Sequence, residues 1–242
     1  MAKQRLEVLH EEESFLVINK PSGVLSVPDR YDQDLPNAKH LLQEIYGDIL
    51  TVHRIDKDTS GLLAFARTAD AHRNLSQQFA AHSPRKVYLA LVEGIPFENE
   101  GVIETPLIED PRKPGRMTTA AKGLSAHTTY KVVEKYANFS LLEVGIKTGR
   151  THQIRVHLQS IGHPVVGDPF YGRRHELFLS SIKGKKYRKA KGRQERPLMG
   201  RTALQAYQLQ LEHPISGEEV SFEADLPKDF RATLNQLSRW DR

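Results

Sequence analysis

Short hydrophobic runs separated by turn residues predict that the first part of the chain is rich in β-strands. The runs at residues 6–10, 15–23 and 24–28 are rich in strand-forming residues and are broken at Pro21, Gly23 and Pro28. Residues 85–94, RKVYLALVEG, are apolar on both faces. A strand buried on both faces lies in the interior of a sheet, so we expect this segment to be a central strand.

The second half of the chain contains two predicted antiparallel pairs. Residues 126–135 and 138–147 both have strand character and are joined by a short turn. Residues 203–214 and 218–227 follow the same pattern, with a serine and a glycine between them. Strands that are close in sequence pair most simply as hairpins, which favours a mostly antiparallel sheet.

Helices are predicted between these strands from their caps. Asn37 and Thr68 each precede a segment with apolar residues at helical spacing, and both side chains are good N-caps. Thr151 is predicted to cap a helix that ends at Gly162, and a last helix starts near Lys228. The whole pattern predicts an α+β fold with a mostly antiparallel mixed central sheet flanked by helices and loops.

Composition narrows the class of protein. The 242 residues can bury a substantial core, and 35 Lys and Arg against 30 Asp and Glu give a net charge of +5. A basic balance fits an acidic partner, of which nucleic acid is the commonest. The chain has no cysteine, and no segment approaches the about 20 consecutive apolar residues of a membrane span. We therefore expect a soluble cytoplasmic protein.

The positive charge is concentrated in residues 183–201, KGKKYRKAKGRQERPLMGR. This segment carries nine basic residues and one acid, Glu195, for a net +8, so the rest of the chain is at −3, the difference from +5. Two interpretations stay open: a solvated, disordered loop, or a mobile arm that binds phosphates.

Two polar clusters are candidates for chemistry. In residues 53–61, HRIDKDTSG, Asp56 is surrounded by basic side chains; taken alone, this is equally a turn in which the carboxylate accepts from backbone donors. The second cluster, residues 147–157, has Arg150 and Arg155 where a strand leads into a helix. Cations are disfavoured at a helix start, so we expect these arginines to balance a negative charge.

Other kinds of site do not fit the pattern. His152 and His157 are five residues apart, unlike the four-residue spacing that places two metal ligands on one helix face, so we expect no metal. Ser22, Ser26 and Ser60 lack the G-x-S-x-G setting of a serine hydrolase. A phosphate-binding loop is also absent from the sequence.

Several motifs, in the same order along the chain, resemble the RluA-type pseudouridine synthases. The resemblance covers about residues 6–230. HRxD-x-x-TSG and GRTHQIRVHL are together highly specific. The motifs are NKPSGVLSVP, VHRIDKDTSGLLAFART, RKVYLALVEG, KTGRTHQIRVHLQSIGHPVVGDPFYG and LQAYQLQLEHPISGEEVSFEADLP.

The resemblance implies an RNA uridine isomerase that breaks the bond between ribose and uracil nitrogen, rotates the base and rejoins it through carbon. By the same resemblance Asp56 is the catalytic carboxylate, and Tyr88 and Arg155 are the other catalytic residues. Arg54 corresponds to a residue that fills the place of the flipped base. Such a protein takes the target nucleotide out of the RNA stack before reacting.

The resemblance further implies how the RNA is held. Arg54, Lys86, Arg150 and Gln153 are its predicted substrate-binding residues. The partner is structured RNA; we expect ribosomal RNA because the basic segment suits a large anion, and transfer RNA stays open. Neither a cofactor nor a metal is expected, because the isomerisation has no redox or group-transfer demand. We expect a monomer with one catalytic domain over residues 1–242, without an upstream S4 RNA-binding module.

Physical reasoning supports these roles. Asp56 must be ionised to act, and an arginine beside it opposes the increase in its pKa that burial would cause. We expect Arg155 to be this arginine, because its planar fork can hold the Asp56 carboxylate with two hydrogen bonds. Tyr88 could relay a proton from the base carbon or stack on uracil. Asp58 would share a strand face with Asp56, but the resemblance requires no carboxylate there.

The sequence departs from the family pattern at one point that bears on the site. Relatives usually have Leu-His-Ala where this chain has Gln205 in LQA, so a contact made by that histidine is in question. Residues 183–201 also lengthen the connection after GDPFYG. We hypothesise that this basic segment compensates for the S4 module.

Two other functions are considered. Asp56 and Asp58 could form the carboxylate pair of a glycoside hydrolase, but that chemistry needs one acid with a raised pKa, and the surrounding cations act in the opposite direction. A non-catalytic RNA-binding relative would have no reason to carry Asp56, Tyr88 and Arg155 together.

Overall fold

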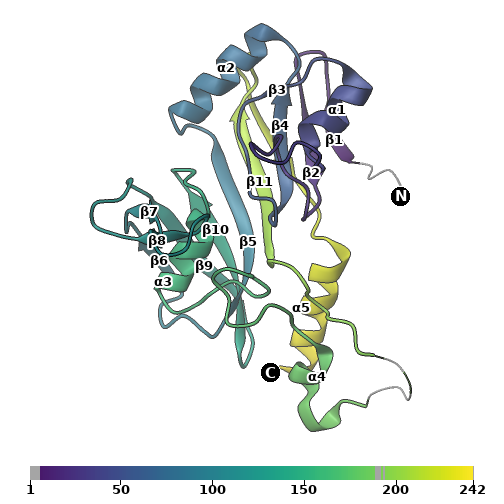
Figure 1. Ribbon diagram of the computed structural model, residues 1–242, viewed down its shortest axis with the longest axis vertical. Helices are drawn as coiled ribbons and strands as arrows, with labels where there is room; N and C mark the ends of the chain where they lie inside the picture. The colour runs from purple at the N-terminus through teal and green to yellow at the C-terminus, as the bar shows by residue number, and fades with distance from the viewer. Residues whose placement is uncertain (1–5, 189–191, 193, 242) are drawn as a thin grey trace. The chain divides into compact units, whose positions relative to one another are not determined.

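The computed structural model describes residues 6–188, 192 and 194–241 (Figure 1). Contacts divide the chain into two compact units. Unit 1 consists of Met1–Tyr88 and Gln205–Asp225, and unit 2 of Leu89–Leu204 and Leu226–Arg242. That the whole chain acts as one catalytic domain stays a prediction.

Unit 1 is a sheet with two helices. Its strands lie in the order β1-β2-β4-β11, with β3 on β4 and β12 on β11. The pairs are antiparallel except β4 with β11, which is parallel. The elements are β1 (Glu7–Glu11), β2 (Phe15–Lys20), α1 (Ala38–Tyr46), β3 (Leu50–Thr51), β4 (Ser60–Ala66), α2 (Ala69–Ala80), β11 (Leu204–Glu212) and β12 (Glu219–Glu223).

Both helices of unit 1 begin where the sequence predicts. The Asn37 side chain accepts from the N–H of His40 at 2.9 Å, and Thr68 Oγ1 accepts from Ala71 N–H at 3.3 Å. Such caps satisfy N–H groups that have no partner within the helix.

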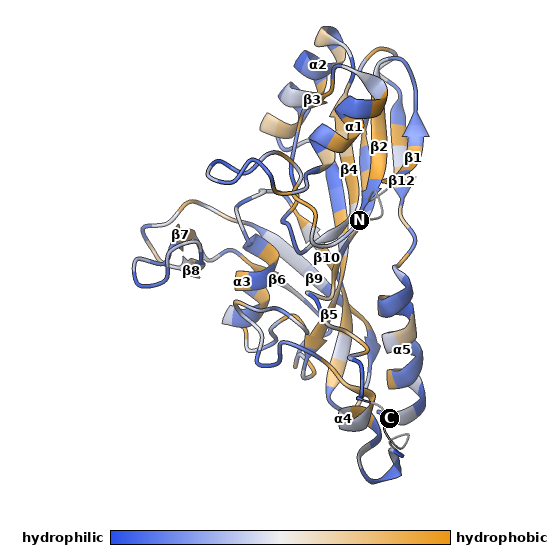
Figure 2. Cartoon of the chain, turned by 45° about the vertical axis from the view of Figure 1, so that its right-hand side comes forward, coloured by the Kyte–Doolittle hydropathy of each residue, from blue (hydrophilic) through white to orange (hydrophobic). Residues whose placement is uncertain are grey.

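The core of unit 1 lies between the sheet and α1. Strands β2 and β4 are largely hydrophobic, as Figure 2 shows, and every residue of β4 is buried. The packed cluster consists of Leu16, Ile18, Val24, Ala38, Leu42, Ile49, Leu63 and Phe65. This core supports the loop that leads into β4, where Asp56 lies.

Unit 2 contains the other strands and the C-terminal helix. The strand order is β5-β10-β9-β6, with β9 antiparallel to both β6 and β10, and β7 and β8 form a separate hairpin. Strand β5 begins in unit 1 and continues into unit 2. The elements are β5 (Arg85–Glu93), β6 (Glu100–Ile103), β7 (Leu107–Glu109), β8 (Met117–Thr119), β9 (Thr128–Lys135), β10 (Phe139–Ile146), α3 (Gln153–Ser160), α4 (Leu179–Lys183), η1 (Gly184–Lys186) and α5 (Lys228–Trp240).

The predicted α+β class with a mostly antiparallel sheet is confirmed, and so are the pairs β9–β10 and β11–β12. The buried strand predicted at residues 85–94 is β5, in which Val87 to Glu93 are all buried. In the described part of the chain, none of the helices has the length and apolar character needed to cross a membrane.

Three local predictions were wrong. Residues 24–28 are not a strand, because the Leu25 backbone bonds to the chain around Asn37 instead, with Leu25 N–H on Pro36 O at 3.1 Å. Helix α3 is not capped by Thr151: its N-cap is His152, whose φ of 54° is left-handed. Asp56 and Asp58 share no strand face, because both lie in the loop before β4.

The basic segment is only partly described, since residues 189–191 and 193 lie outside the described residues. Its end is firmly attached. Leu177 and Met199 form a bridge with N–H to O distances of 2.8 and 3.2 Å, and the Arg201 guanidinium holds the Asp229 carboxylate at 2.7 and 2.8 Å. Residues 198–201 are therefore part of the folded unit and not of a loose arm.

Candidate active site

Asp56 lies in a loop held by the NKPSG segment. Ser26 Oγ donates to the carbonyl of Ile55 at 2.7 Å and accepts from the Ile55 N–H at 3.1 Å. Ser22 Oγ donates to the Asp58 carbonyl at 2.8 Å, and Gly23 N–H donates to Lys57 O at 2.9 Å. The residues on both sides of Asp56 are thus fixed at their backbones.

Lys20 is the central residue of this support. Its side chain is fully buried, and its ammonium donates to the carbonyls of Val24, Pro21 and Lys57 at 2.6, 3.0 and 3.1 Å. An ammonium has three donors, and three carbonyls accept them here. The Lys20 side chain therefore links the backbone of the residues that follow it to the loop that carries Asp56.

The far end of the loop is held by β11. Ser60 Oγ donates to Gln205 Oε1 at 2.5 Å, and Gln205 Nε2 donates to Asp225 O at 3.3 Å; both side chains are buried. A Cβ at Gly61, whose φ is 113°, would lie 2.2 Å from Ala206 O, so only glycine fits this close approach. The Gln205 side chain therefore makes polar contacts on both sides at this point.

The loop turn is closed by backbone. The Asp56 carbonyl accepts from Thr59 N–H at 3.2 Å, so the turn itself does not require the carboxylate as its acceptor. The negative charge of Asp56 acts on Tyr88: burial first, and then this charge, raise the pKa of the Tyr88 phenol well above its ordinary value. Tyr88 is consequently a neutral hydroxyl near the Asp56 carboxylate.

His53 is held uncharged at the start of the loop. Its Nε2 accepts from Ala64 N–H at 3.0 Å, and its ring stacks on Phe79 with centroids 4.2 Å apart. Burial, and next the charge of Lys86, lower the pKa of His53 to about 3. The Lys86 ammonium lies 5.9 Å from the Phe79 centroid, and burial lowers its pKa as well. Arg54, in contrast, is exposed.

In unit 2, Arg155 is held by a residue that the sequence analysis did not single out. Arg155 Nε and Nη2 donate to the two carboxylate oxygens of Asp168 at 2.6 and 2.8 Å, and both side chains are almost fully buried. The guanidinium also lies 5.1 Å from the Tyr171 ring centroid and 5.5 Å from that of Phe170. Arg155 thus makes a two-bond contact with Asp168, and its predicted place beside Asp56 stays a prediction.

Asp168 also accepts hydrogen bonds from the backbone that follows it. Its Oδ1 accepts from the N–H groups of Phe170 and Tyr171 at 2.8 and 3.0 Å. One carboxylate therefore shapes the GDPFY turn and fixes the direction of the Arg155 guanidinium. Asp168 belongs to a quoted motif, but no local sequence signal connects it with a residue thirteen positions earlier.

The buried side chain of Gln153 is bound on all sides within the protein. Its Oε1 accepts from Thr148 Oγ1 and Arg150 N–H, and its Nε2 donates to His127 O and Thr128 Oγ1, at 2.8 to 3.0 Å. All four hydrogen-bonding positions of this buried amide are used within the protein. These contacts hold the loop around Arg150, and the substrate-binding role of Gln153 stays a prediction.

The two histidines of α3 also have structural partners. His157 is fully buried and bonds Thr128 Oγ1 at 2.8 Å and Thr105 O at 2.9 Å; burial lowers its pKa. His152 Nδ1 bonds Tyr171 Oη at 2.8 Å. Arg150 is partly exposed, with Nε on Ser125 O at 3.0 Å.

Comparison with known proteins agrees with this arrangement. Residues 14–160 match the family RNA pseudouridylate synthase. The chain is 39% identical to ribosomal large subunit pseudouridine synthase D of Zymomonas mobilis, covering 96% of this chain and 73% of that protein. It is 36% identical to the dual-specificity RNA pseudouridine synthase RluA of Escherichia coli K12, covering 93% and 94%.

Other relatives differ in length or are known as structures. Ribosomal large subunit pseudouridine synthase D of Nitrosomonas europaea is 38% identical, and the chain spans 65% of it. The solved structure of human RNA pseudouridylate synthase domain containing 4 superposes with a TM-score of 0.73 at 26% identity, covering 96% of this chain and 93% of that one. The chain therefore belongs to the RNA pseudouridylate synthase family and is of the RluA type.

Proposed function

We propose that this pseudouridine synthase acts on uridines of structured ribosomal RNA, with Asp56 as its catalytic carboxylate. The observation that carries the proposal is the fixed loop around Asp56, in which Ile55, Lys57 and Asp58 are all held by hydrogen bonds to the NKPSG segment. A carboxylate that attacks a sugar or base must be held in one direction, because misplacement of a reacting group is costly to the rate.

The charge of Asp56 fits the role of nucleophile. The positive side chains on the same loop, Arg54 and Lys57, are of the charge that stabilises a carboxylate anion. A glycoside hydrolase would need one protonated carboxyl, which this surrounding disfavours. The isomerase is therefore the function that the chemistry of the loop supports best.

Tyr88 is assigned a role as a neutral group. Since its pKa lies above the ordinary phenol value, the hydroxyl stays protonated near neutral pH. A protonated phenol donates a hydrogen bond or stacks on the flipped uracil, and it is a poor acceptor for the proton that leaves the base carbon. We assign Tyr88 to orienting the base.

Arg54 and Arg155 complete the proposed set. Arg54 is exposed on the Asp56 loop, where a planar guanidinium could occupy the space left by the flipped base. Arg155 is included because of the family motif, and Asp168 supplies the fixed orientation that a catalytic guanidinium needs. Lys86 and Arg150 are proposed to contact RNA phosphates.

The test is release of tritium from RNA that carries the label on the uracil carbon where the new bond forms. Ribosomal and transfer RNA are supplied separately. An isomerase releases the label, a hydrolase yields free uracil, and a simple RNA-binding protein does neither. Asp56→Asn should abolish release, whereas Asp58→Asn should retain it. Label release from transfer RNA alone would overturn the proposed ribosomal substrate.

Transfer RNA is the second candidate, because the relative that this chain covers at 94% of its length is named a dual-specificity enzyme. Mapping pseudouridines in RNA from cells that lack the protein separates the two. We also propose a cytoplasmic location and a monomer. The absence of cysteine fits a reducing compartment. Cell fractionation and light scattering test these two points.

A further inference from the structure

Three lysines and a tryptophan form an exposed group in unit 2, where α4 and η1 contact the end of α5. The Lys183 ammonium lies 4.4 Å from the Trp240 ring centroid and that of Lys186 lies 5.8 Å from it. Lys185 is exposed on η1, and Trp240 is 40% exposed. We call Lys183, Lys185, Lys186 and Trp240 the lysine–tryptophan surface.

The surface is built on an anchored part of the basic segment. Ile182 is buried, and α4 packs against α5. The bridge between Leu177 and Met199 closes the base of the segment, and Arg201 is paired with Asp229 on α5. The three lysines are therefore presented on folded chain, which reduces the conformational entropy lost when they bind a ligand.

The acid of the basic segment does not neutralise these lysines. Glu195 Oε1 accepts from Ser180 N–H at 2.8 Å, and its charge contributes to a raised pKa of Tyr187, for which burial is the larger cause. Among the described residues, no carboxylate lies within ion-pair distance of Lys183, Lys185 or Lys186. Their charge is thus available to an external anion.

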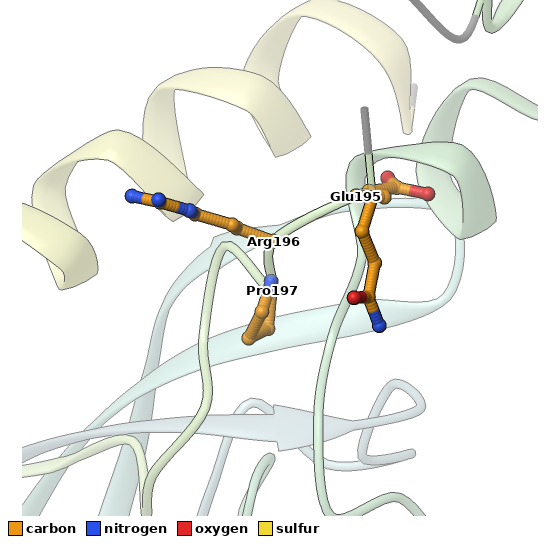
Figure 3. Close-up of a pocket in the computed structure, with 4 residues that line it drawn as sticks. Glu195, Arg196 and Pro197 are labelled. Carbon is orange, nitrogen blue, oxygen red and sulfur yellow. The ribbon is translucent and has the colours of Figure 1, made fainter. Parts of the chain in front are cut away.

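The basic segment also lines a hollow of about 810 Å³, through Gln194, Glu195, Arg196 and Pro197. Figure 3 shows the side chains of Glu195 and Arg196 pointing to opposite sides of the segment. Glu195 is held by the start of α4, while Arg196 is exposed and adds a further cation. The hollow therefore lies along the same basic segment that carries the three lysines.

We propose that the lysine–tryptophan surface binds the phosphate backbone of the substrate RNA outside the nucleotide that is modified. This deepens the proposed function and depends on it only for the identity of the RNA. Charge complementarity is the reason for choosing RNA: the basic segment makes a chain of otherwise negative net charge positive. The indole holds two ammonium groups in place and is itself able to stack on a base.

The first test uses the unaltered protein, because Trp240 is its single tryptophan. The fluorescence lifetime of Trp240 is measured while a transcript of bacterial large-subunit ribosomal RNA is added, and binding is followed separately by filter retention. The lifetime should change in parallel with binding and recover at high salt. A lifetime that stays constant at saturation would overturn the proposal.

The second test removes charge at the surface and elsewhere. The double variant Lys183→Gln, Lys186→Gln should bind the transcript about tenfold more weakly, and the slope of log affinity against log salt should fall by about 1.5, as expected for two phosphate contacts. The matched control Lys131→Gln, Lys135→Gln loses the same charge from exposed positions on β9. If both double variants weaken RNA binding equally, the effect comes from the general charge of the protein and not from this surface. That result would refute the proposal.

Trp240 is tested by two replacements. Trp240→Phe keeps an aromatic face and should bind more tightly than Trp240→Leu, with both folded as judged by circular dichroism. If wild type, Trp240→Phe and Trp240→Leu bind the transcript equally, the Trp240 ring takes no part in RNA binding.

These results are separable from the proposed function. If the surface is wrong but the function right, Lys183→Gln, Lys186→Gln matches its control while wild type still releases tritium. If the function is wrong, wild type releases no tritium, yet the variant still differs from its control in binding. A lifetime change with an acidic protein but not with RNA would point to the wrong partner and overturn the proposal.

Discussion

Ser26 Oγ exchanges two hydrogen bonds with Ile55, donating to its carbonyl at 2.7 Å and accepting from its N–H at 3.1 Å. Both groups are buried. The Ser26 hydroxyl therefore satisfies both backbone groups of Ile55, as a neighbouring strand would. Ile55 is the residue between Arg54 and Asp56.

Replacing Ser26 tests this relationship. Ser26→Ala leaves the Ile55 N–H and carbonyl without these partners and should reduce stability by about 1 to 3 kcal/mol. The turnover number should fall more than the KM changes, because the Asp56 loop is less fixed. Urea unfolding and tritium release measure the two effects. Ser22→Ala, at a less buried position, is the comparison and should do less; equal turnover in wild type and Ser26→Ala would contradict the positioning role.

The Arg155–Asp168 pair allows stability to be separated from catalysis. Asp168→Asn removes the carboxylate charge that pairs with the buried Arg155 guanidinium and should cost about 3 to 5 kcal/mol. Adding Arg155→Met removes the guanidinium charge, while the asparagine oxygen still accepts from the Phe170 and Tyr171 N–H groups. The double variant should recover much of the stability, measured by urea unfolding.

Activity should not recover with it. If Arg155 is catalytic, tritium release stays lost in the double variant although the protein is folded. Normal release by that variant would remove Arg155 from the catalytic set and leave it a purely structural residue.

His53 should make stability depend on pH. Its folded-state pKa of about 3 lies below the ordinary 6.5, so the unfolded chain takes up the proton first as the pH falls. The contribution of His53 is therefore complete above pH 6.5 and decreases as the pH falls toward 3. His53→Gln retains an acceptor for Ala64 N–H but does not titrate.

The measurement is the free energy of unfolding at neutral pH and at a pH of about 5. Wild type should lose more stability than His53→Gln over this interval, and the difference isolates His53 from the other histidines. Identical losses would mean that His53 is not held neutral in the folded protein.

Gln205 is expected to stabilise the protein through its hydrogen bond with Ser60. Gln205→Ala removes the acceptor of the buried Ser60 hydroxyl and the donor to Asp225 O, and should destabilise the protein by about 1 to 3 kcal/mol. Gln205→His, with a ring nitrogen as acceptor, should lose less. Gln208→Ala, an exposed contact on the same strand, is the control. A Gln205→Ala protein as stable as this control would disprove the anchoring role.

Features encoded by neighbouring residues could be predicted from the sequence. Asn37 and Thr68 cap their helices because a cap needs only its own side chain and an N–H three residues later. Tyr88 was expected on an inner strand because the apolar pattern of residues 87–92 is continuous. The motif around Asp56 identified the reaction class through resemblance.

Contacts between distant residues could not be predicted. Ser26 with Ile55, Lys20 with Lys57 and Ser60 with Gln205 join segments whose pairing follows from the tertiary fold alone. The start of α3 was misplaced because His152 adopts a left-handed conformation, which a sequence pattern assigns to glycine or asparagine. The four intramolecular hydrogen bonds of Gln153 were likewise not predictable, because the polarity of a motif does not reveal which partners an amide has.

Unit 1 is formed by two stretches that are far apart in the sequence, and this has a consequence during synthesis of the chain. When a ribosome has made the chain as far as Tyr88, Asp56 already exists, but β11 and β12 do not, and β4 has an unpaired edge. The partner of Ser60 is translated 145 residues later. A nascent or truncated chain that stops before Gln205 therefore has Asp56 without the strand that completes the unit, and the enzyme should gain activity only near the end of translation.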